Sequence, residues 1–394
     1  MLDMVYYIES RENMYSFLND YSEGAHPLVL DALIHTNSEQ TVGYGCDVYC
    51  QKAKEVILKR IQNQNADVHF LVGGTQTNMT FISYVLRDYQ AVIASDEGHI
   101  NVHETGSIEA TGHKVITKPH QEGKITVEMI QALLSEHTDE HMVQPVMVYI
   151  SQTTELGSYY TLKELQTLYA FTREKGLYLF LDGARLGSSL VLEDAPNMAE
   201  IAANVDAFYI GGTKMGAMFG EALVIINNNL KKDFRFQMKQ KGAMLAKGRL
   251  LGVQFYALLK DSLYEDIGRH ENEMAMIIKQ AFEEKGYSLY VPSFTNQIFV
   301  DLDSNIIQAI EKEFMVTHIK KINEKKERIR IVTSWATPVE EAAISIVSPV
   351  LGLRPVLASL ALTSKVPNPF KVILSPSFNP SVTVATKALT AASA

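Results

Sequence analysis

The sequence has little cysteine, no excess of basic residues and no long apolar run, and each shortage excludes a class of protein. Two cysteines among 394 residues, Cys46 and Cys50, are too few for a Cys-rich zinc site and are typical of a reducing compartment. Lys and Arg number 36 against 45 Asp and Glu. The chain therefore lacks the excess of positive charge that broad binding to nucleic acids or anionic membranes requires. No run of about 18 apolar residues is present to span a membrane.

The N-terminal stretch MLDMVYYIESRENMY carries acidic residues and no apolar core of signal-peptide length. We therefore expect a cytoplasmic protein that is not exported, holds no metal, and binds neither nucleic acid nor membranes. The hydrophobic share of 46% and the charged share of 21% are those of a globular protein rather than a disordered chain. The length is sufficient for one large α/β domain and a smaller one.

The last 53 residues, 342–394, differ in composition from the rest of the chain. They contain no Asp or Glu, four basic residues and six of the 12 prolines. Prolines at this density prevent long helices, and no strand alternation emerges. We interpret 342–394 as a weakly ordered tail or as sequence foreign to the fold, with a partner-binding segment as a less favoured alternative.

Before this tail, short apolar runs alternate with stretches of helical periodicity. The expected strands are His69–Val72, Ala91–Ala94, Val146–Ile150, Tyr178–Leu181, Ala207–Ile210 and Ala222–Ile226. Helical stretches such as Met79–Leu86 and Thr161–Lys175 lie between them, and a long helix is expected from about residue 250. This alternation predicts an α/β fold with a mainly parallel sheet covered on both faces. A strand pair around Gln297–Leu302 and Arg328–Thr333 then suits a smaller α+β domain.

These patterns divide the chain into four segments. We expect an N-terminal arm over 1–45, a large domain over 46–249 and a small C-terminal domain over 250–341. The atypical tail occupies 342–394.

Ligands of parallel α/β sheets bind beyond the carboxyl ends of the strands, so the residues at those ends are the candidates for chemistry. Gly74 and Thr75 lie in a glycine turn that leads into a helix, where free backbone amides suit a phosphate, although such a turn is also an ordinary helix cap. His99 follows another strand, where it could stack on a flat ring or simply cap a helix.

Two further strand ends carry ionisable residues. Asp182 ends the buried run LFLD, where its carboxylate needs a cation, either Arg185 or a protonated ring nitrogen. Lys214 follows a buried strand within FYIGGTKMG, where crowding lowers a lysine pKa and favours the neutral amine that forms a Schiff base. Each residue alone has an ordinary structural explanation. Together, a phosphate turn, a stacking histidine, a strand-end acid and an imine-forming lysine are what pyridoxal 5'-phosphate (PLP) requires.

The segments LFLDGARL and FYIGGTKMG closely resemble the threonine aldolase and β-eliminating lyase branch of fold-type I PLP-dependent enzymes, over about residues 14–340. The resemblance implies the fold-type I architecture, a large domain followed by a smaller one. It also implies a PLP-dependent carbon–carbon lyase that cleaves L-threonine or L-allo-threonine to glycine and an aldehyde. Its relatives are homotetramers built from dimers with shared sites, so a homotetramer or homodimer is expected.

By this resemblance, each candidate residue receives a role. Lys214 forms the imine with PLP, Asp182 holds the ring-nitrogen proton, and His99 stacks on the ring. The expected cofactor contacts also include Gly74, Thr75, Gln76, Arg185 and Thr213. Arg185 and Arg330 are expected to bind the substrate carboxylate, together with Asn19, and Tyr44 is expected to reach into the site of a neighbouring subunit.

The sequence departs from the family pattern at three places. Glu155 stands where the aldolases carry a histidine that helps to bind the substrate hydroxyl, and its carboxylate could accept the same proton. Leu245 stands where an arginine of the neighbouring subunit lies near the phosphate, with Lys241, Lys247 and Arg249 close by as substitutes. Cys46-Asp47 stand where the family carries an acidic-rich turn after Tyr-Gly. We interpret Cys46 and Cys50 as unpaired thiols.

Two alternatives to the aldolase stay open. Glu155 leaves room for another PLP-dependent amino-acid reaction, namely β-elimination, transamination or racemisation. A non-catalytic PLP-fold or phosphate-binding protein is the second alternative, but it gives no reason for Asp182 and Lys214 at this spacing.

Overall fold

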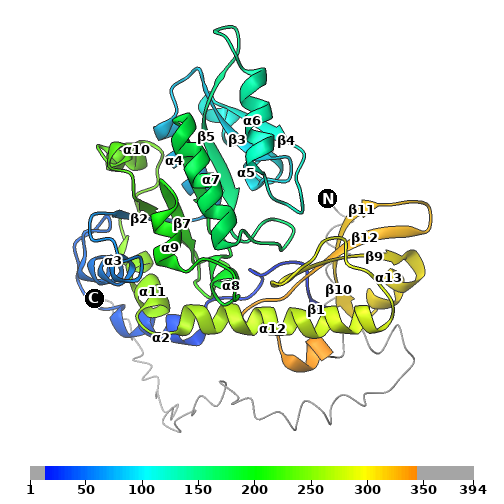
Figure 1. Ribbon diagram of the computed structural model, residues 1–394. Helices are drawn as coiled ribbons and strands as arrows, with labels where there is room; N and C mark the ends of the chain where they lie inside the picture. Colours follow the sequence, from blue (N-terminus) through cyan, green and yellow to red (C-terminus); the bar gives the residue numbers. More distant parts are fainter. Residues whose placement is uncertain (1–13, 344–394) are drawn as a thin grey trace, which may run out of the picture. The chain divides into compact units, whose positions relative to one another are not determined.

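The computed structural model describes residues 14–343, so the predicted tail lies outside the described residues apart from its first two positions. The core of the described chain is a seven-stranded sheet (Figure 1). Its strands are β2 (Asp67–Leu71), β3 (Gln90–Ser95), β4 (Lys114–Lys118), β5 (Gln144–Ser151), β6 (Tyr178–Asp182), β7 (Ala207–Gly211) and β8 (Glu221–Ile225), in the order β2-β8-β7-β6-β5-β3-β4. Only β8 runs antiparallel to its neighbours, which confirms the expected mainly parallel α/β sheet.

All six predicted strands fall on strands of this sheet, whereas β4 was not predicted. It lies at the sheet edge, begins and ends with lysine and is only partly buried. The continuous apolar run that identified the other strands is therefore lacking there.

Helices of the described chain lie before, between and after these strands along the sequence. They are α2 (Pro27–Thr36), α3 (Val48–Arg60), α4 (Gly74–Val85), α5 (His99–Val102), α6 (Val127–Glu136), α7 (Leu162–Lys175), α8 (Leu186–Leu190), α9 (Met198–Ala203), α10 (Phe234–Gln240), α11 (Arg249–Leu259), α12 (Leu263–Glu284) and α13 (Ser304–Ile310), with short 3₁₀ turns η1 (Glu109–Thr111) and η2 (Asn228–Leu230). None of them has the length and apolar character needed to cross a membrane.

The sheet is buried on both faces, because alternate residues of each strand enter different apolar clusters. On β5, Val148 and Ile150 pack with α3, α6, α7, α9 and α11, whereas Met147 and Tyr149 pack with α4 and α10 on the other face. A sheet covered on both sides exposes only its strand ends, which is where ligands of such folds bind.

The long helix expected from residue 250 is instead two helices, α11 and α12. The side chain of Arg60 donates hydrogen bonds to the backbone oxygens of Leu259, at 2.8 Å, and of Asp261. Arg60 thus supplies a hydrogen-bond donor for carbonyl groups at the end of α11, so the helix need not continue to satisfy them. The polar segment 260–262 separates the two helices.

A second sheet lies beyond α12, which runs along the lower side of the view in Figure 1. Its antiparallel strands, in the order β11-β12-β9, are β9 (Gln297–Asp303), β11 (Thr317–Lys321) and β12 (Lys326–Val332). Strand β1 (Tyr15–Ser16) pairs separately with β10 (Phe314–Met315). The second half of α12 packs on β9 and β12, and the two strands confirm the predicted pair.

Candidate active site

The ends of β6 and β7 approach each other so closely that only glycine fits between them. The amide of Gly211 donates to the oxygen of Gly183 at 2.9 Å. A Cβ atom on Gly183 would lie 1.9 Å from the oxygen of Tyr209, and one on Gly211 would lie 2.4 Å from the oxygen of Ala184. The glycines of LFLDGARL and FYIGGTKMG therefore let the two strand ends carry Asp182 and Lys214 into one site.

Asp182 is a buried carboxylate supplied with donors from three elements. Its Oδ2 accepts hydrogen bonds from the hydroxyl of Tyr149 on β5 and, at 3.2 Å, from the amide nitrogen of Asn78 on α4. Its Oδ1 accepts from the backbone amide of Ala184 at 3.0 Å. Hydrogen bonds to a carboxylate favour its charged form, which is the form that can hold a protonated ring nitrogen.

Lys214 is buried beside several charged groups. Burial lowers its pKa, the positive charge of Arg185 lowers it further, and the nearby acids Asp20, Asp182 and Glu221 act in the opposite direction with a smaller net effect. A lowered lysine pKa favours the neutral amine, the nucleophile of Schiff-base chemistry. The Nζ atom lies 6.0 Å from the centroid of the Tyr21 ring, which the sequence did not single out.

His99 begins α5 and is held by a buried carboxylate. Its Nδ1 lies 2.8 Å from Glu104, whose side chain is fully buried and also accepts hydrogen bonds from Asn78 at 2.8 Å and Ser107 at 2.6 Å. Asn78 thereby links the partner of His99 to Asp182. Glu104 and Asn78 were not predicted, because nothing local in the sequence marks them as buried.

The first turn of α4 offers backbone amides. Gly73 precedes the helix without a side-chain cap, and a Cβ atom there would meet nothing within 4 Å. The amides of Gly74, Thr75 and Gln76 have no intrahelical acceptor, as in any first helical turn, so they can bind a phosphate. The Gln76 side chain is already engaged, because its Oε1 accepts from the amide of Val72 at 3.3 Å.

Thr213, another predicted cofactor contact, is engaged elsewhere. Its hydroxyl donates to Glu221 at 3.0 Å and accepts from the amide of Gly220 at 3.0 Å. Burial raises the pKa of Glu221 to about 8, although Thr213 and Lys214 act to lower it. This glutamate beside the lysine is a further residue that sequence reasoning missed.

Arg185 is held in a fork by Asp20 rather than by Asp182. Its Nε and Nη2 atoms lie 2.6 Å and 3.0 Å from the Asp20 carboxylate, which also accepts from Asn296 at 2.8 Å. Burial alone would raise the pKa of Asp20, but the charges of Arg185 and Lys214 and these hydrogen bonds bring it below its ordinary value. The predicted Asn19 instead caps its own turn, accepting from Tyr21 and Ser22.

Arg330 on β12 faces the same region from the small sheet. Its Nη2 donates to the oxygen of Leu18 at 3.2 Å, while its buried Nε has no hydrogen-bond partner in the described chain. Burial lowers the pKa of Arg330, and the nearby charge of Arg185 lowers it further. Two guanidinium groups that repel each other are a suitable partner for a carboxylate.

Glu155 lies behind the start of α5. Its Oε1 accepts hydrogen bonds from the amide of His99 at 2.9 Å and from the hydroxyl of Ser151 at 2.6 Å. Burial raises its pKa, and the charge of Asp182 adds to this against the effect of the Ser151 hydrogen bond. The carboxylate therefore anchors His99 in addition to any role toward a substrate.

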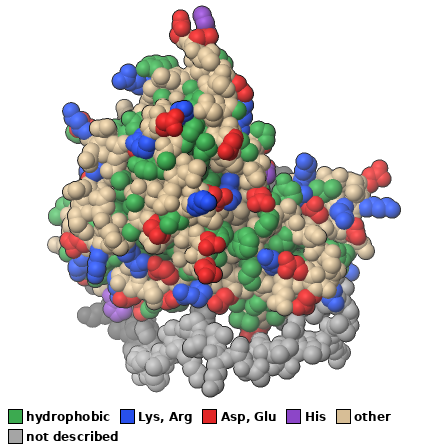
Figure 2. All heavy atoms as spheres, viewed as in Figure 1, with side chains coloured by type: hydrophobic (Ala, Val, Ile, Leu, Met, Phe, Trp, Pro, Cys, Tyr) green, Lys and Arg blue, Asp and Glu red, His purple; other side chains and the backbone are tan. Residues whose placement is uncertain are grey.

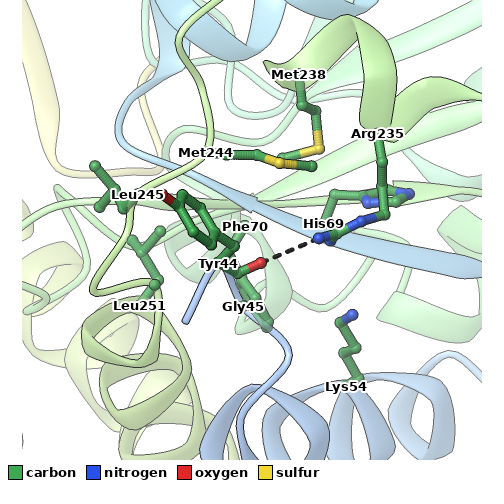
Figure 3. A pocket seen from close by; sticks show the side chains of 11 residues that line it. Tyr44, Gly45, Lys54, His69, Phe70, Arg235, Met238, Met244, Leu245 and Leu251 are labelled. Carbon is green, nitrogen blue, oxygen red and sulfur yellow. Dashed lines mark hydrogen bonds between the residues drawn. The ribbon is translucent and has the colours of Figure 1, made fainter. Parts of the chain in front are cut away.

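Tyr44 lies apart from this group in the single chain and lines a separate pocket with His69 and Leu245 (Figure 3). Arg235 donates to the backbone oxygen of Tyr44 at 3.1 Å, and the Nζ atom of Lys239 lies 4.6 Å from the centroid of its ring. These two cations, neither of them predicted, are the basic groups that contact Tyr44.

Arg249, which was expected to substitute for the family arginine, already makes hydrogen bonds within its own chain. It is buried, and its guanidinium donates to the backbone oxygens of Thr36 and Glu39. Cys46 and Cys50 are both unpaired, the first exposed and the second buried.

Comparison with known proteins agrees with this geometry. The family described as "Beta-eliminating lyase" matches residues 25–305. The chain belongs to the beta-eliminating lyase family. Within this family, it is 47% identical to a threonine aldolase of Leishmania major of known structure, with 85% of this chain and 98% of that chain covered and a TM-score of 0.84.

More distant proteins are similar to the chain in sequence or in fold. A low specificity L-threonine aldolase of Pseudomonas aeruginosa is 29% identical over 298 residues, 75% of this chain and 86% of that protein. An aspartate aminotransferase of Thermus thermophilus, 10% identical with a TM-score of 0.66 over 88% of this chain and 93% of that one, shares the fold. The protein is thus a PLP-dependent lyase of fold type I.

The residues around Lys214 fit PLP. The site combines a buried amine, a carboxylate for the ring nitrogen, free helix amides for the phosphate and an imidazole fixed by Glu104. Asn78 keeps a buried Oδ1 atom with no partner in the described chain, so the site retains an acceptor for a ligand group. No cluster of three or more metal-ligating side chains occurs within 14–343.

Proposed function

We propose that this protein cleaves L-threonine or L-allo-threonine, and related β-hydroxy amino acids, to glycine and an aldehyde. The observation that carries the proposal is the juxtaposition of Asp182 and Lys214 at the ends of β6 and β7, made possible by two glycines in contact. The names of the Leishmania and Pseudomonas relatives, both threonine aldolases, support the choice of substrate.

PLP held at Lys214 would supply the electron sink for the bond that breaks, and the residues around it would hold it and the substrate in position. Asp182, with its three donors, holds the proton on the ring nitrogen. The imidazole of His99, fixed by Glu104, would hold the cofactor ring. The amides of Gly74, Thr75 and Gln76 bind the phosphate, with the Thr213 hydroxyl beside them.

Arg185 and Arg330 orient the substrate through its carboxylate. Arg185 is fixed by the Asp20 fork, while the Nε of Arg330 has no hydrogen-bond partner among residues 14–343. Bidentate binding of a carboxylate by arginine sets both position and orientation, so the bond to be broken is placed against the ring. Asn19 is proposed to assist in binding the substrate carboxylate, and Tyr44 is proposed to reach into the site of a neighbouring subunit. Glu155 is retained as a candidate acceptor of the hydroxyl proton.

A second candidate is another PLP-dependent reaction of amino acids, namely β-elimination, transamination or racemisation. Glu155 favours it, because a carboxylate with a raised pKa stands where the aldolases carry a histidine. A binding protein without catalysis is disfavoured by the buried amine of Lys214.

The proposal extends to the setting of the enzyme. We place it in the cytoplasm as a homotetramer or homodimer with shared sites, acting on a small molecule and not on nucleic acid or membranes. On the face in Figure 2, acidic and basic side chains are interspersed over the described residues, as expected for such a protein. The four-segment division at 45, 249 and 341 is proposed with it.

The deciding experiment measures aldehyde release from L-threonine and L-allo-threonine by the PLP-loaded protein, with Lys214→Ala as the control. We expect release by the parent and none by the variant, since removal of the imine-forming amine removes the site of cofactor attachment. A parent that binds PLP in a lysine-dependent manner yet releases no aldehyde would refute cleavage of threonine and favour the second candidate.

A further inference from the structure

His103 is a second histidine at the mouth of the site, and no role has been given to it so far. It follows α5 directly, one helical turn after His99, and the two ring centroids lie 5.5 Å apart at an interplanar angle of 53°. Its side chain is exposed, and its imidazole makes no hydrogen bond to any residue of the described chain.

The charged groups of the site face this imidazole from four elements. Partial burial lowers the pKa of His103 most, followed by the positive charges of His99, Arg330, Lys214 and Arg185. These groups come from α5, β12, the segment after β7 and the start of α8. The imidazole therefore lies beside the ring of His99 and within electrostatic range of the Lys214 amine and the two guanidinium groups. It is neutral near pH 7, the state in which a histidine accepts a proton.

The other candidate bases around Lys214 already have partners. Glu155 accepts from the His99 amide and from Ser151. His99 is bound through Nδ1 to Glu104, and Asp20 is bound to Arg185. Among the described residues, His103 is the imidazole at this mouth whose two nitrogens are free to meet a ligand.

We propose that His103 accepts the proton of the substrate β-hydroxyl, which makes it a catalytic residue; this inference rests on the proposed function. The ring nitrogen takes the hydroxyl proton as the C–O bond becomes the carbonyl of the departing aldehyde. The Cα–Cβ bond breaks, and its electron pair remains with Cα. Cα then takes up a proton to become the methylene of glycine, and His103 returns its proton to solvent, so all atoms of the amino acid reappear in the two products.

The test compares His103→Asn with Glu155→Gln, with His141→Asn as a matched exposed-histidine control. For each PLP-loaded protein, kcat and KM are measured for aldehyde release from L-threonine, together with exchange of a glycine Cα proton for deuterium. Loss of a general base lowers kcat by roughly 10²- to 10⁴-fold, so His103→Asn should show this loss with KM little changed. Glycine exchange should be retained, because glycine has no β-hydroxyl.

A pH profile and a labelling experiment separate catalysis from structure. The kcat/KM of the parent should fall at acidic pH as His103 becomes protonated, with a midpoint below the ordinary histidine value, and this limb should be absent in His103→Asn. In the cofactor-free parent, acylation of His103 by diethyl pyrocarbonate should show the same low midpoint.

Each outcome decides the assignment. If His103→Asn keeps the parent kcat and pH profile while Glu155→Gln loses them, the proton acceptor is Glu155 and the proposal is overturned. Equal loss of glycine exchange and cleavage in His103→Asn would also overturn it, since that pattern indicates a damaged site. A parent that releases no aldehyde refutes the proposed function itself, and the assignment with it.

Discussion

Two sets of buried carboxylates surround Lys214, and they differ in the donors that they receive. The donor-rich set, Asp20 and Asp182, accepts hydrogen bonds from a guanidinium, two amide side chains, a tyrosine and a backbone amide. The donor-poor set, Glu221 on β8 and Glu271 on α12, accepts one or two hydrogen bonds each, and one Glu271 oxygen has no partner in the described chain.

Depth of burial does not separate the two sets, because all four side chains are nearly inaccessible to solvent. The pKa values of Asp20, Glu221 and Glu271 are nevertheless shifted in different directions. The pKa of Asp20 lies below its ordinary value, whereas burial raises that of Glu221 to about 8 and that of Glu271 well above its usual range. The supply of donors and cations, rather than burial, decides which acids carry charge near the lysine.

The largest effect is expected from Asp20→Ala, which breaks the donor-rich set. Arg185 would remain buried without its partner, and loss of one partner of a buried ion pair destabilises by about 3–5 kcal/mol. Urea unfolding measures this change. Asp301→Ala is the matched control, because Asp301 binds Arg328 in the same fork at 2.7 Å and 3.0 Å but is partly exposed, so about 0–1 kcal/mol is expected. Equal losses in the two variants would contradict the comparison.

A smaller effect is expected from Tyr149→Phe, which removes one donor of Asp182 and preserves shape. A hydrogen bond to a charged group contributes about 1.5–3 kcal/mol, so unfolding free energy should fall by this order. The affinity for PLP, measured by equilibrium dialysis, should fall too, because Asp182 is then less well held for the ring nitrogen. Tyr160→Phe, which removes a buried hydroxyl bonded to the backbone of Ile125, is the control and should leave PLP affinity unchanged.

How much of this site the sequence could predict depends on where each contact partner lies in the chain. Asp182 directly follows an apolar run, and Lys214 and His99 follow theirs within five residues, a local signal that identified these strand ends. Asp20 was missed in favour of its neighbour Asn19, because its partner Arg185 lies 165 positions away and no local pattern records that pairing.

The fold shows the same division. Strands buried on both faces were identified from their apolar runs, but the edge strand β4 was not. The break between α11 and α12 also escaped prediction, because it depends on Arg60, 199 positions before the carbonyl that it binds. The pattern of apolar residues along the sequence indicates which segments are buried. It does not indicate which polar residues, distant in the sequence, the fold brings into contact.

A change in the pH dependence of stability is expected from Glu221→Gln, which tests the comparison from the donor-poor side. Glutamine keeps the acceptor for Thr213 but cannot ionise. The pKa of Glu221 is raised on folding, so its contribution to stability is complete below about pH 4.5 and is lost as pH rises through about 8.

The unfolding free energy of the cofactor-free parent should therefore decline more steeply than that of Glu221→Gln between pH 5 and pH 8. The difference between the two curves should level off above the folded pKa. Parallel curves over this range would show that Glu221 is already ionised at neutral pH. In that case two hydrogen bonds would suffice to keep a buried acid charged beside Lys214, and the number of donors would not be what distinguishes the two sets.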